Sequence, residues 1–394
     1  MQVALGAVYA WSVFRIPLTK TYGWTIPEVT LAFEIAILVL GFAAAVGGVW
    51  MRRAGPRPVA FTAALLYGCG VALAGPSAGH LALLYLTYGI LAGIGLGLGY
   101  IVPVATLIQW FPDRRGMITG VAVAGFGAGA LITAPLAQAL IQAVGVAATF
   151  EILGIAYLAI IAGAAFFMKE PPRGYVQPGF NPSNSKFKEQ NSQSFVLRQA
   201  LGTWQWYALW LTLFLNTTAG IALISQASPM AQEISHVTAA RAAGLVGIVS
   251  IANGMGRLLW AWLSDLLGRR IVFAIMFLLQ ALAFALLSQA ESFGALTILA
   301  FLVLLCYGGG FGTMPAFAAD FFGPKNIGSV YGFMLTAWGA AGVCGPTLIA
   351  TVREASGHYE GAFRIMAGVM LLGAVAPLLL HPPRLRQARP KEPL

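Results

Sequence analysis

Charged side chains are scarce in this sequence. Only 9% of the 394 residues are Asp, Glu, Lys or Arg, whereas 59% are hydrophobic. A water-soluble domain of this size carries about 25% charged residues. The chain therefore has too few polar side chains to cover a surface that faces water. We expect most of its surface to face lipid, which makes it a polytopic helical membrane protein.

Cysteine is rare, and the motifs of soluble enzymes are missing. Cys69, Cys306 and Cys344 lie in apolar runs without paired spacing, which favours small core residues over disulfides or metal ligands. The sequence contains no Walker loop, no His-Glu-x-x-His motif and no nucleophile elbow. The run 93–100, "GIGLGLGY", lies inside an apolar stretch without a preceding strand, so we interpret it as a helix-packing surface. We predict a protein that is not an enzyme, needs no cofactor and would drive transport by gradients.

Long apolar runs fill most of the chain. Most of them have about 20 residues or more, enough for a helix to cross a hydrocarbon core of about 30 Å. The first run lacks the basic start and cleavage site of a signal peptide. It is short at one end, so we expect further residues to precede it. The twelve predicted spans lie near 2–18, 31–50, 59–77, 81–110, 115–142, 147–168, 204–232, 240–266, 270–290, 293–321, 326–352 and 361–381.

The net charge of +10 is distributed unevenly between the two sides of the predicted membrane. Of the 23 basic residues, 17 lie in or next to loops on one side, five lie toward the other side, and Arg257 alone lies deep inside a span. The positive-inside rule makes the basic side cytoplasmic. The charge thus orients the protein in the cytoplasmic (inner) membrane and does not indicate a nucleic-acid partner.

A single long polar segment, 169–203, divides the chain into six spans plus six. Its Pro, Asn, Ser and charged residues are typical of a linker, which we place in the cytoplasm. We predict a first half at 1–168, a second half at 204–381 and a cytoplasmic tail at 382–394. We expect the protein to act as a monomer in the lipid bilayer.

The two halves repeat each other in sequence. Residues 111–135 and 322–346 share glycine spacing and a final proline, and the same register places Phe126 opposite Trp338. Repeated six-helix halves usually enclose a substrate site between them near the membrane midplane. The loops after spans two and eight resemble the Gly-x-x-x-Asp-x-x-Gly-Arg-Arg signature of the major facilitator superfamily. The resemblance implies a gating role for Asp265, Arg269 and Arg270 in the second copy, and for Arg52 and Arg53 in the first, where Arg52 occupies the acidic position.

Arg257 is the one permanent positive charge near the middle of a predicted span. Its insertion costs roughly 2.5–3.5 kcal/mol, so it needs a wet cavity or an anionic partner. One interpretation is a structural ion pair with Glu34 or Glu151. The other is a site for an anionic substrate, because the planar guanidinium fork suits a carboxylate. Asn253 lies four residues earlier on the same helix face and serves either as a substrate ligand or as a contact between helices.

Three segments resemble the oxalate/formate antiporter family, which is related to the monocarboxylate transporters. They are "YAWSVFRIPL" (9–18), "NTTAGIALISQASPMAQE" (216–233) and "NGMGRLLWAWLSD" (253–265). The resemblance covers essentially the whole chain and implies that Arg257 binds a substrate carboxylate. The oxalate exchanger has a second cation, a lysine in span eleven, where this chain has Trp338.

A single cation favours a monoanion over a dianion, because an uncompensated charge in a poorly solvated site is costly. We therefore expect lactate, pyruvate or a short fatty acid as the substrate. Aromatic side chains are candidates to line the cavity, with ordinary helix packing as the alternative for each. These candidates are Tyr9, Trp11, Tyr100, Phe126, Tyr307, Phe311 and Trp338.

Proton coupling is less well defined by the sequence. Monocarboxylate transporters of eukaryotes pair their arginine with an aspartate, where this chain has Asn253, and they carry a lysine in span one, which is missing here. Glu34 is the nearest acid within a span, although it equally fits a charge at a helix N-terminus. We predict proton-coupled symport of a small monocarboxylate such as L-lactate by alternating access. Carboxylate exchange is the alternative, and a non-transporting nutrient sensor is a more remote one.

Overall fold

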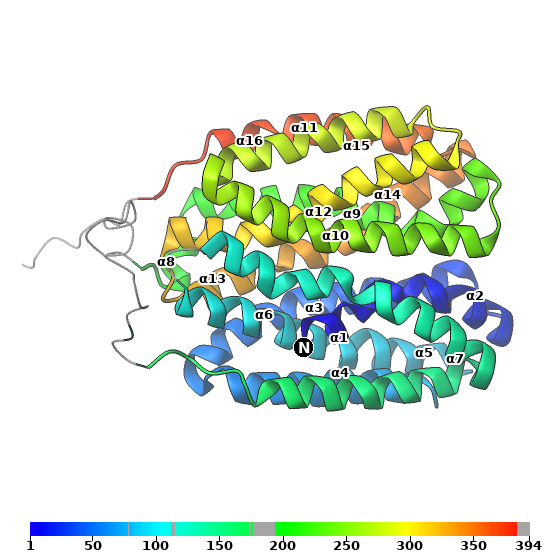
Figure 1. Cartoon of the computed structure of the whole chain (residues 1–394), viewed down its shortest axis with the longest axis horizontal. Helices are drawn as coiled ribbons and strands as arrows, with labels where there is room; N and C mark the ends of the chain where they lie inside the picture. The colour runs from blue at the N-terminus through cyan, green and yellow to red at the C-terminus, as the bar shows by residue number, and fades with distance from the viewer. Residues whose placement is uncertain (78, 112–114, 173–174, 176–193, 384–394) are drawn as a thin grey trace, which may run out of the picture.

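The computed structural model describes residues 1–394 except 78, 112–114, 173–174, 176–193 and 384–394. Every element in the described part of the chain is helical. The helices form two bundles that lie side by side with their axes along the length of the molecule (Figure 1). One bundle contains the N-terminal helices, coloured blue to teal, and the other contains the C-terminal helices, coloured green to red.

The N-terminal half begins with a broken helix and ends with two crossings joined at a kink. Its elements are α1 (Gln2–Leu5), η1 (Gly6–Ala10), α2 (Trp11–Tyr22), α3 (Ile26–Ala54), α4 (Pro56–Ala74), α5 (Leu81–Leu84), η2 (Tyr85–Ala92), α6 (Gly93–Trp110) and α7 (Arg115–Ala165). Inside α7, Gly145 has a φ of 84°, where the path of the helix breaks. The predicted boundary between spans five and six lies at this glycine.

The C-terminal half follows the short helix α8 (Leu197–Leu201). Its elements are α9 (Trp204–Ser235), α10 (Ala239–Leu267), α11 (Arg269–Leu287), α12 (Phe293–Phe322), α13 (Ile327–Met334), α14 (Thr336–Ser356), α15 (Glu360–Gly373) and α16 (Val375–Leu378). The predicted eleventh span is thus two helices, α13 and α14, and the twelfth is α15 with α16.

The number of crossings agrees with the predicted twelve. Ten helices of the described residues are long and apolar enough to span a membrane. The helix α7 counts twice because of its kink, and the first crossing, made of α1, η1 and α2, adds the twelfth. The first crossing is not one of these ten helices, because the 3₁₀ helix η1 in its middle divides it into shorter pieces.

Glycines mark the same turn in both halves. Gly55 ends α3 with a φ of 79°, and Gly268 ends α10 with a φ of 91°. Both values lie in the region that only glycine adopts without strain. Each glycine lies within or directly after one of the two signature-like loops. The structure therefore agrees with the internal repeat predicted from the sequence.

Small residues also line the seams between the halves, where α7 packs on α10 and α3 packs on α13 and α14. A Cβ atom on Gly127 would lie 2.7 Å from the Gly254 nitrogen. A Cβ on Gly41 would lie 2.7 Å from the Leu335 carbonyl oxygen. Such seams let membrane helices approach closely.

Two predictions about the rest of the chain have different outcomes. The segments 169–203 and 382–394 fall mostly outside the described residues, so the linker and tail remain predictions. The cysteines are unpaired, and only Cys306 is buried; Cys69 is half-buried and Cys344 is exposed. The expectation of three core positions is therefore wrong for Cys344, which lies at an exposed position of α14.

Candidate substrate site

Arg257 lies between the two halves and is fully buried. Its Nε donates a hydrogen bond to Asn253 Oδ1 (3.2 Å), and its Nη1 donates to the Val123 carbonyl of α7 (3.2 Å). Its Nη2 has no hydrogen-bond partner among the described residues. No carboxylate of the described part of the chain forms an ion pair with it. The proposed pairing with Glu34 or Glu151 is therefore wrong, since Glu34 lines an outer cavity and Glu151 is exposed.

Two aromatic rings replace a carboxylate beside the guanidinium. Its Cζ lies 5.3 Å from the centre of the Phe126 ring and 4.9 Å from that of Phe311. A cation near a ring face at such distances gains about 0.5–2 kcal/mol, more when both groups are desolvated. The rings stabilise the buried cation but do not neutralise it. Arg257 therefore retains its full charge for a ligand.

Trp338 is at the centre of the cluster of rings. Its ring centroid lies 4.5 Å from Phe311, 5.2 Å from Tyr100, 5.4 Å from Phe126 and 6.5 Å from Tyr9. The repeat partners Phe126 and Trp338 are thus in direct contact. Six of the seven predicted aromatic residues form this group, which we call the aromatic cage: Tyr9, Tyr100, Phe126, Tyr307, Phe311 and Trp338.

The cage joins the two halves through a hydrogen bond. The hydroxyl groups of Tyr9 in η1 and Tyr307 in α12 are 2.6 Å apart. Gly220 in α9 permits the position of Tyr307, because a Cβ there would lie within 2.5 Å of the Tyr307 side chain. The contact closes the cage at the level of Arg257.

Several buried donors in or beside the cage have no hydrogen-bond partner. Trp338 Nε1 and the Tyr100 hydroxyl belong to the cage, and Arg257 Nη2 and the Tyr331 hydroxyl lie beside it. The two tyrosine hydroxyls lie near each other and near Arg257 without a well-formed hydrogen bond. An unsatisfied buried polar group costs about 1–3 kcal/mol. A set of such donors around a cation matches the needs of a ligand rich in acceptor oxygens. The sequence analysis did not single out Tyr331, although it lies in the same segment as Trp338.

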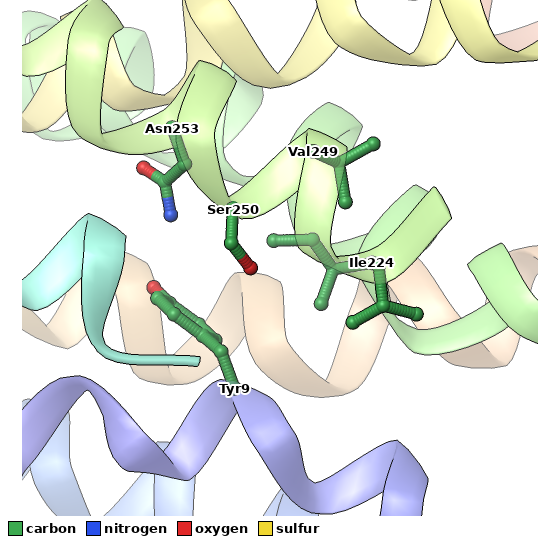
Figure 2. A pocket seen from close by; sticks show the side chains of 6 residues that line it. Tyr9, Ile224, Val249, Ser250 and Asn253 are labelled. Atoms are coloured by element: carbon green, nitrogen blue, oxygen red, sulfur yellow. The ribbon is translucent and has the colours of Figure 1, made fainter. Parts of the chain in front are cut away.

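A small pocket adjoins Asn253 and the cage residue Tyr9. Tyr9, Ile224, Val246, Val249, Ser250 and Asn253 line it, and Figure 2 shows Tyr9 facing Ser250 and Asn253 of α10 across it. Its volume of about 10 Å³ leaves room for about one water. We call it the Ser250 pocket. Sequence analysis missed Ser250, although its spacing from Asn253 and Arg257 marks one helix face.

A second small pocket and a large cavity continue from the Ser250 pocket toward one end of the bundle. Tyr9 and Ile224 belong to both small pockets, and Arg15 and Thr30 belong to both the second pocket and the cavity. The cavity has a volume of about 840 Å³ and lies between α2 and α3 of one half and α9 and α14 of the other. We call it the vestibule. The three spaces form a series that leads past Tyr9 to Asn253, the hydrogen-bond partner of Arg257.

The vestibule wall contains charges of both signs. Arg353 Nη2 forms an ion pair with Glu233 Oε2 at 2.5 Å, and the Tyr359 hydroxyl donates to the same oxygen at 3.1 Å. Burial and the neighbouring Glu233 raise the pKa of Tyr359 above its usual range, so the phenol remains a donor. Arg15, Glu28 and Glu34 face them from the other half.

Comparisons with known proteins agree with this architecture. The model of the Major Facilitator Superfamily matches residues 2–263 and again 209–394. The chain belongs to the major facilitator superfamily. It is 30% identical to the uncharacterized MFS-type transporter YhjX of Escherichia coli (strain K12), over 87% of this chain and 83% of that protein.

Two further relatives in the superfamily have names that specify a substrate. The chain is 27% identical to the oxalate:formate antiporter of Oxalobacter formigenes, over 92% of this chain and 84% of that protein. It is 24% identical to monocarboxylate transporter 13 of Rattus norvegicus, over 96% of this chain and 86% of that protein. The predicted relationship to the oxalate/formate and monocarboxylate transporters is confirmed.

The solved structures show the same fold. The human organic anion transporter MFSD10 (TETRAN) has a TM-score of 0.71 at 16% identity and covers 95% of this chain and 98% of its own. The transporter FucP in the outward conformation has a TM-score of 0.68 at 18% identity, and the match covers 95% of this chain and 97% of FucP. The twelve-helix fold of the major facilitator superfamily is thereby established.

The signature loop of this major facilitator protein forms a network at the end of the bundle opposite the vestibule. Asp265 accepts a hydrogen bond from the Met117 backbone N–H of α7 (2.9 Å), which links the two halves. Arg269 contacts Asp265 at 2.6 Å and Asp320 at 3.1 Å. The sequence analysis did not identify Asp320, because it lies on another helix, α12, outside the motif.

Three predicted gating residues, Arg270, Arg52 and Arg53, do not take part in this network. Arg270 donates to the Leu380 carbonyl of its own half (2.9 Å). Arg52 and Arg53 are exposed and form no ion pair with the described residues. The network therefore depends on Asp265 and Arg269, and the first copy of the motif forms no equivalent network within the described part of the chain.

Two predicted site residues lie away from Arg257. Trp11 packs on Tyr88 of η2 (4.3 Å between ring centroids) and on Phe150, within the N-terminal half, with one edge toward the second pocket. Glu34 is half-buried in the vestibule wall. Neither residue belongs to the cage, because each lies nearer to the vestibule end of its helix.

Proposed function

We propose that the protein transports small monocarboxylates such as L-lactate by alternating access. The observation that carries this proposal is Arg257, a buried cation between the two halves that has no carboxylate partner among the described residues and has unsatisfied donors beside it. A carboxylate supplies both the charge and the acceptor oxygens that this group lacks. Binding that neutralises Arg257 lets the halves close over the site and makes reorientation less costly.

The aromatic cage supports a monoanion. Trp338 stands where the oxalate exchanger has a lysine, and its ring contacts four other rings of the cage. A dianion would bring one uncompensated charge into this dry site. The relatives named for monocarboxylates and for oxalate and formate agree with a carboxylate substrate.

Proton symport is the proposed coupling mode, with Glu34 as the candidate carrier. Glu34 is half-buried in the vestibule and forms no hydrogen bond or ion pair with the described residues. An acid in this position can take up a proton from the medium when the vestibule is open. Carboxylate exchange is the alternative mode, because Glu34 lies away from Arg257. The remote alternative, a nutrient sensor, would bind the carboxylate without transporting it.

The orientation follows from the distribution of basic residues. We propose that the protein lies in the cytoplasmic (inner) membrane. The end of the bundle that contains Asp265, the linker and the C-terminus then face the cytoplasm. The vestibule then opens to the outside. We also propose a functional monomer, in which one chain supplies the whole cage.

Uptake into proteoliposomes tests these proposals. We expect accumulation of radiolabelled L-lactate when a pH gradient is imposed, loss of uptake in Arg257→Ala, and normal uptake in the control Arg364→Ala, an exposed position of α15. Normal uptake by Arg257→Ala would refute the site. Counterflow that requires internal carboxylate and ignores the pH gradient would favour exchange, and binding without uptake would favour the sensor.

A further inference from the structure

The face of α10 that carries Arg257 continues outward by two turns. Ser250, Asn253 and Arg257 are separated by three and four residues, a spacing that places them on one helix face. The Arg257 side chain points back along the helix, as its hydrogen bond to Asn253 shows. Since the pitch of an α-helix is about 5.4 Å, Ser250 lies about one turn beyond the Asn253–Arg257 contact.

Some buried helical hydroxyls of the described chain, such as that of Thr313, have no hydrogen-bond partner, and the hydroxyl of Ser250 differs from them because it lines a pocket beside Asn253. Other helical hydroxyls bond to the backbone. Thr212, Thr218 and Thr297 each donate to the carbonyl four residues earlier, at 2.7–2.8 Å. This is the usual way for such a side chain to satisfy itself in a membrane helix. Ser250 is 6% exposed, makes no such bond and forms no hydrogen bond with the described residues. Its hydroxyl group is therefore available to a ligand in the Ser250 pocket.

The remaining walls of the Ser250 pocket are apolar apart from Asn253 and Tyr9. Ile224 of α9 and Val246 and Val249 of α10 contribute branched aliphatic side chains (Figure 2). These walls suit a methyl group or another short alkyl group. The pocket thus combines one hydroxyl with a small hydrophobic surface, next to the cation that would bind a carboxylate.

We propose that Ser250 recognises the oxygen on C2 of the substrate, so that the site selects 2-hydroxy and 2-oxo monocarboxylates with a short alkyl chain. This inference rests on the proposed function. With the carboxylate on Arg257 and Asn253, the C2 oxygen lies two bonds beyond the carboxylate carbon. That oxygen then faces the next turn of α10, while the C3 methyl contacts Ile224 and Val249.

L-lactate and propionate provide the test, because they differ only by the C2 hydroxyl. We expect the wild-type protein in proteoliposomes to prefer L-lactate over propionate in kcat/KM, and Ser250→Ala to lower the preference about fivefold, the value of roughly one hydrogen bond. Propionate uptake by Ser250→Ala should stay near the wild-type value, which shows that the variant is folded. Ser250→Thr should keep the preference because it keeps the hydroxyl group.

Ser225→Ala is the matched control. Ser225 lines the second pocket, nearer to the vestibule, and already donates to the Ala222 carbonyl (2.9 Å). We expect its preference to equal that of the wild type. An unchanged preference in Ser250→Ala, or an equal loss of both substrates, would overturn the role of Ser250. Failure of the wild type to take up any carboxylate would instead refute the proposed function.

Discussion

The C-terminal half brings a cation and an amide to the site, Arg257 and Asn253 of α10, whereas the N-terminal half faces them with Tyr9, Tyr100 and Phe126. When the halves move apart, Arg257 keeps its hydrogen bond to Asn253 of its own half and loses the one to the Val123 carbonyl of α7. Rings on the opposite half can separate from Arg257 without leaving a charge unpaired. We therefore propose that substrate binding belongs mainly to the C-terminal half and closure to the N-terminal half.

The largest expected effect comes from replacing Arg257, the charged group of the C-terminal half, by lysine, which has the same charge and a different shape. We expect Arg257→Lys to lower kcat/KM for L-lactate by about 100-fold, because truncation at a buried charged contact costs 2–5 kcal/mol. Phe126→Leu, on the other half, should cost only about fivefold through the lost cation–ring contact. Similar losses in both variants would remove the distinction between the halves. Initial uptake rates over a range of substrate concentrations measure both values.

The next effect tests whether Trp338 excludes dianions. We expect Trp338→Lys to raise oxalate affinity about tenfold relative to L-lactate, because a second cation balances the second charge. Trp338→Phe keeps an apolar ring and serves as the control. Competition by oxalate against labelled substrate measures the change, and an unaltered ratio would refute the argument from charge.

A smaller effect compares the two copies of the signature loop. Asp265 connects the halves through Met117, whereas Arg52 is exposed. We expect Asp265→Asn to lower the transport rate about fivefold, with KM changed less than twofold, because the carboxylate loses its charge toward Arg269. Arg52→Gln should stay within about twofold of the wild type, as exposed charges do. Equal effects would mean that the copies act alike.

The smallest effect concerns the hydrogen bond between the halves. Tyr9→Phe and Tyr307→Phe should each lower kcat about threefold, since a single hydrogen bond contributes about 0.5–1.5 kcal/mol. The double variant should resemble either single variant, because both remove the same bond. Additive losses would show that the two hydroxyl groups act independently. Transport rates of the four proteins complete the cycle.

Much of the site could be predicted from the sequence because its main signals are local or repeated. The spacing of Asn253 and Arg257 places them on one face of a helix, and the internal repeat aligns Phe126 with Trp338, which are in contact. The charge of Arg257 within an apolar run also marks the site, because lipid makes it costly.

Other parts of the site depend on packing that no local pattern encodes. Trp11 shares a segment with Tyr9, yet it packs on Tyr88 inside its own half. The partner of Arg269 on α12, Asp320, lies outside the motif. The hydrogen bond of Tyr9 joins residues 298 positions apart in the chain. Such outcomes depend on how helices from both halves rotate against each other.

The vestibule has a consequence for inhibition. Its volume of about 840 Å³ falls in the range of about 300–1,000 Å³ typical of drug-binding pockets, whereas the Ser250 pocket holds about one water. A compound can therefore be far too large to become cargo and still bind between the halves, against Arg15 on one wall and the Glu233–Arg353 pair on the other. Such a compound would act from one face of the membrane only. Its selectivity would depend on residues that contact no part of the transported molecule at Arg257.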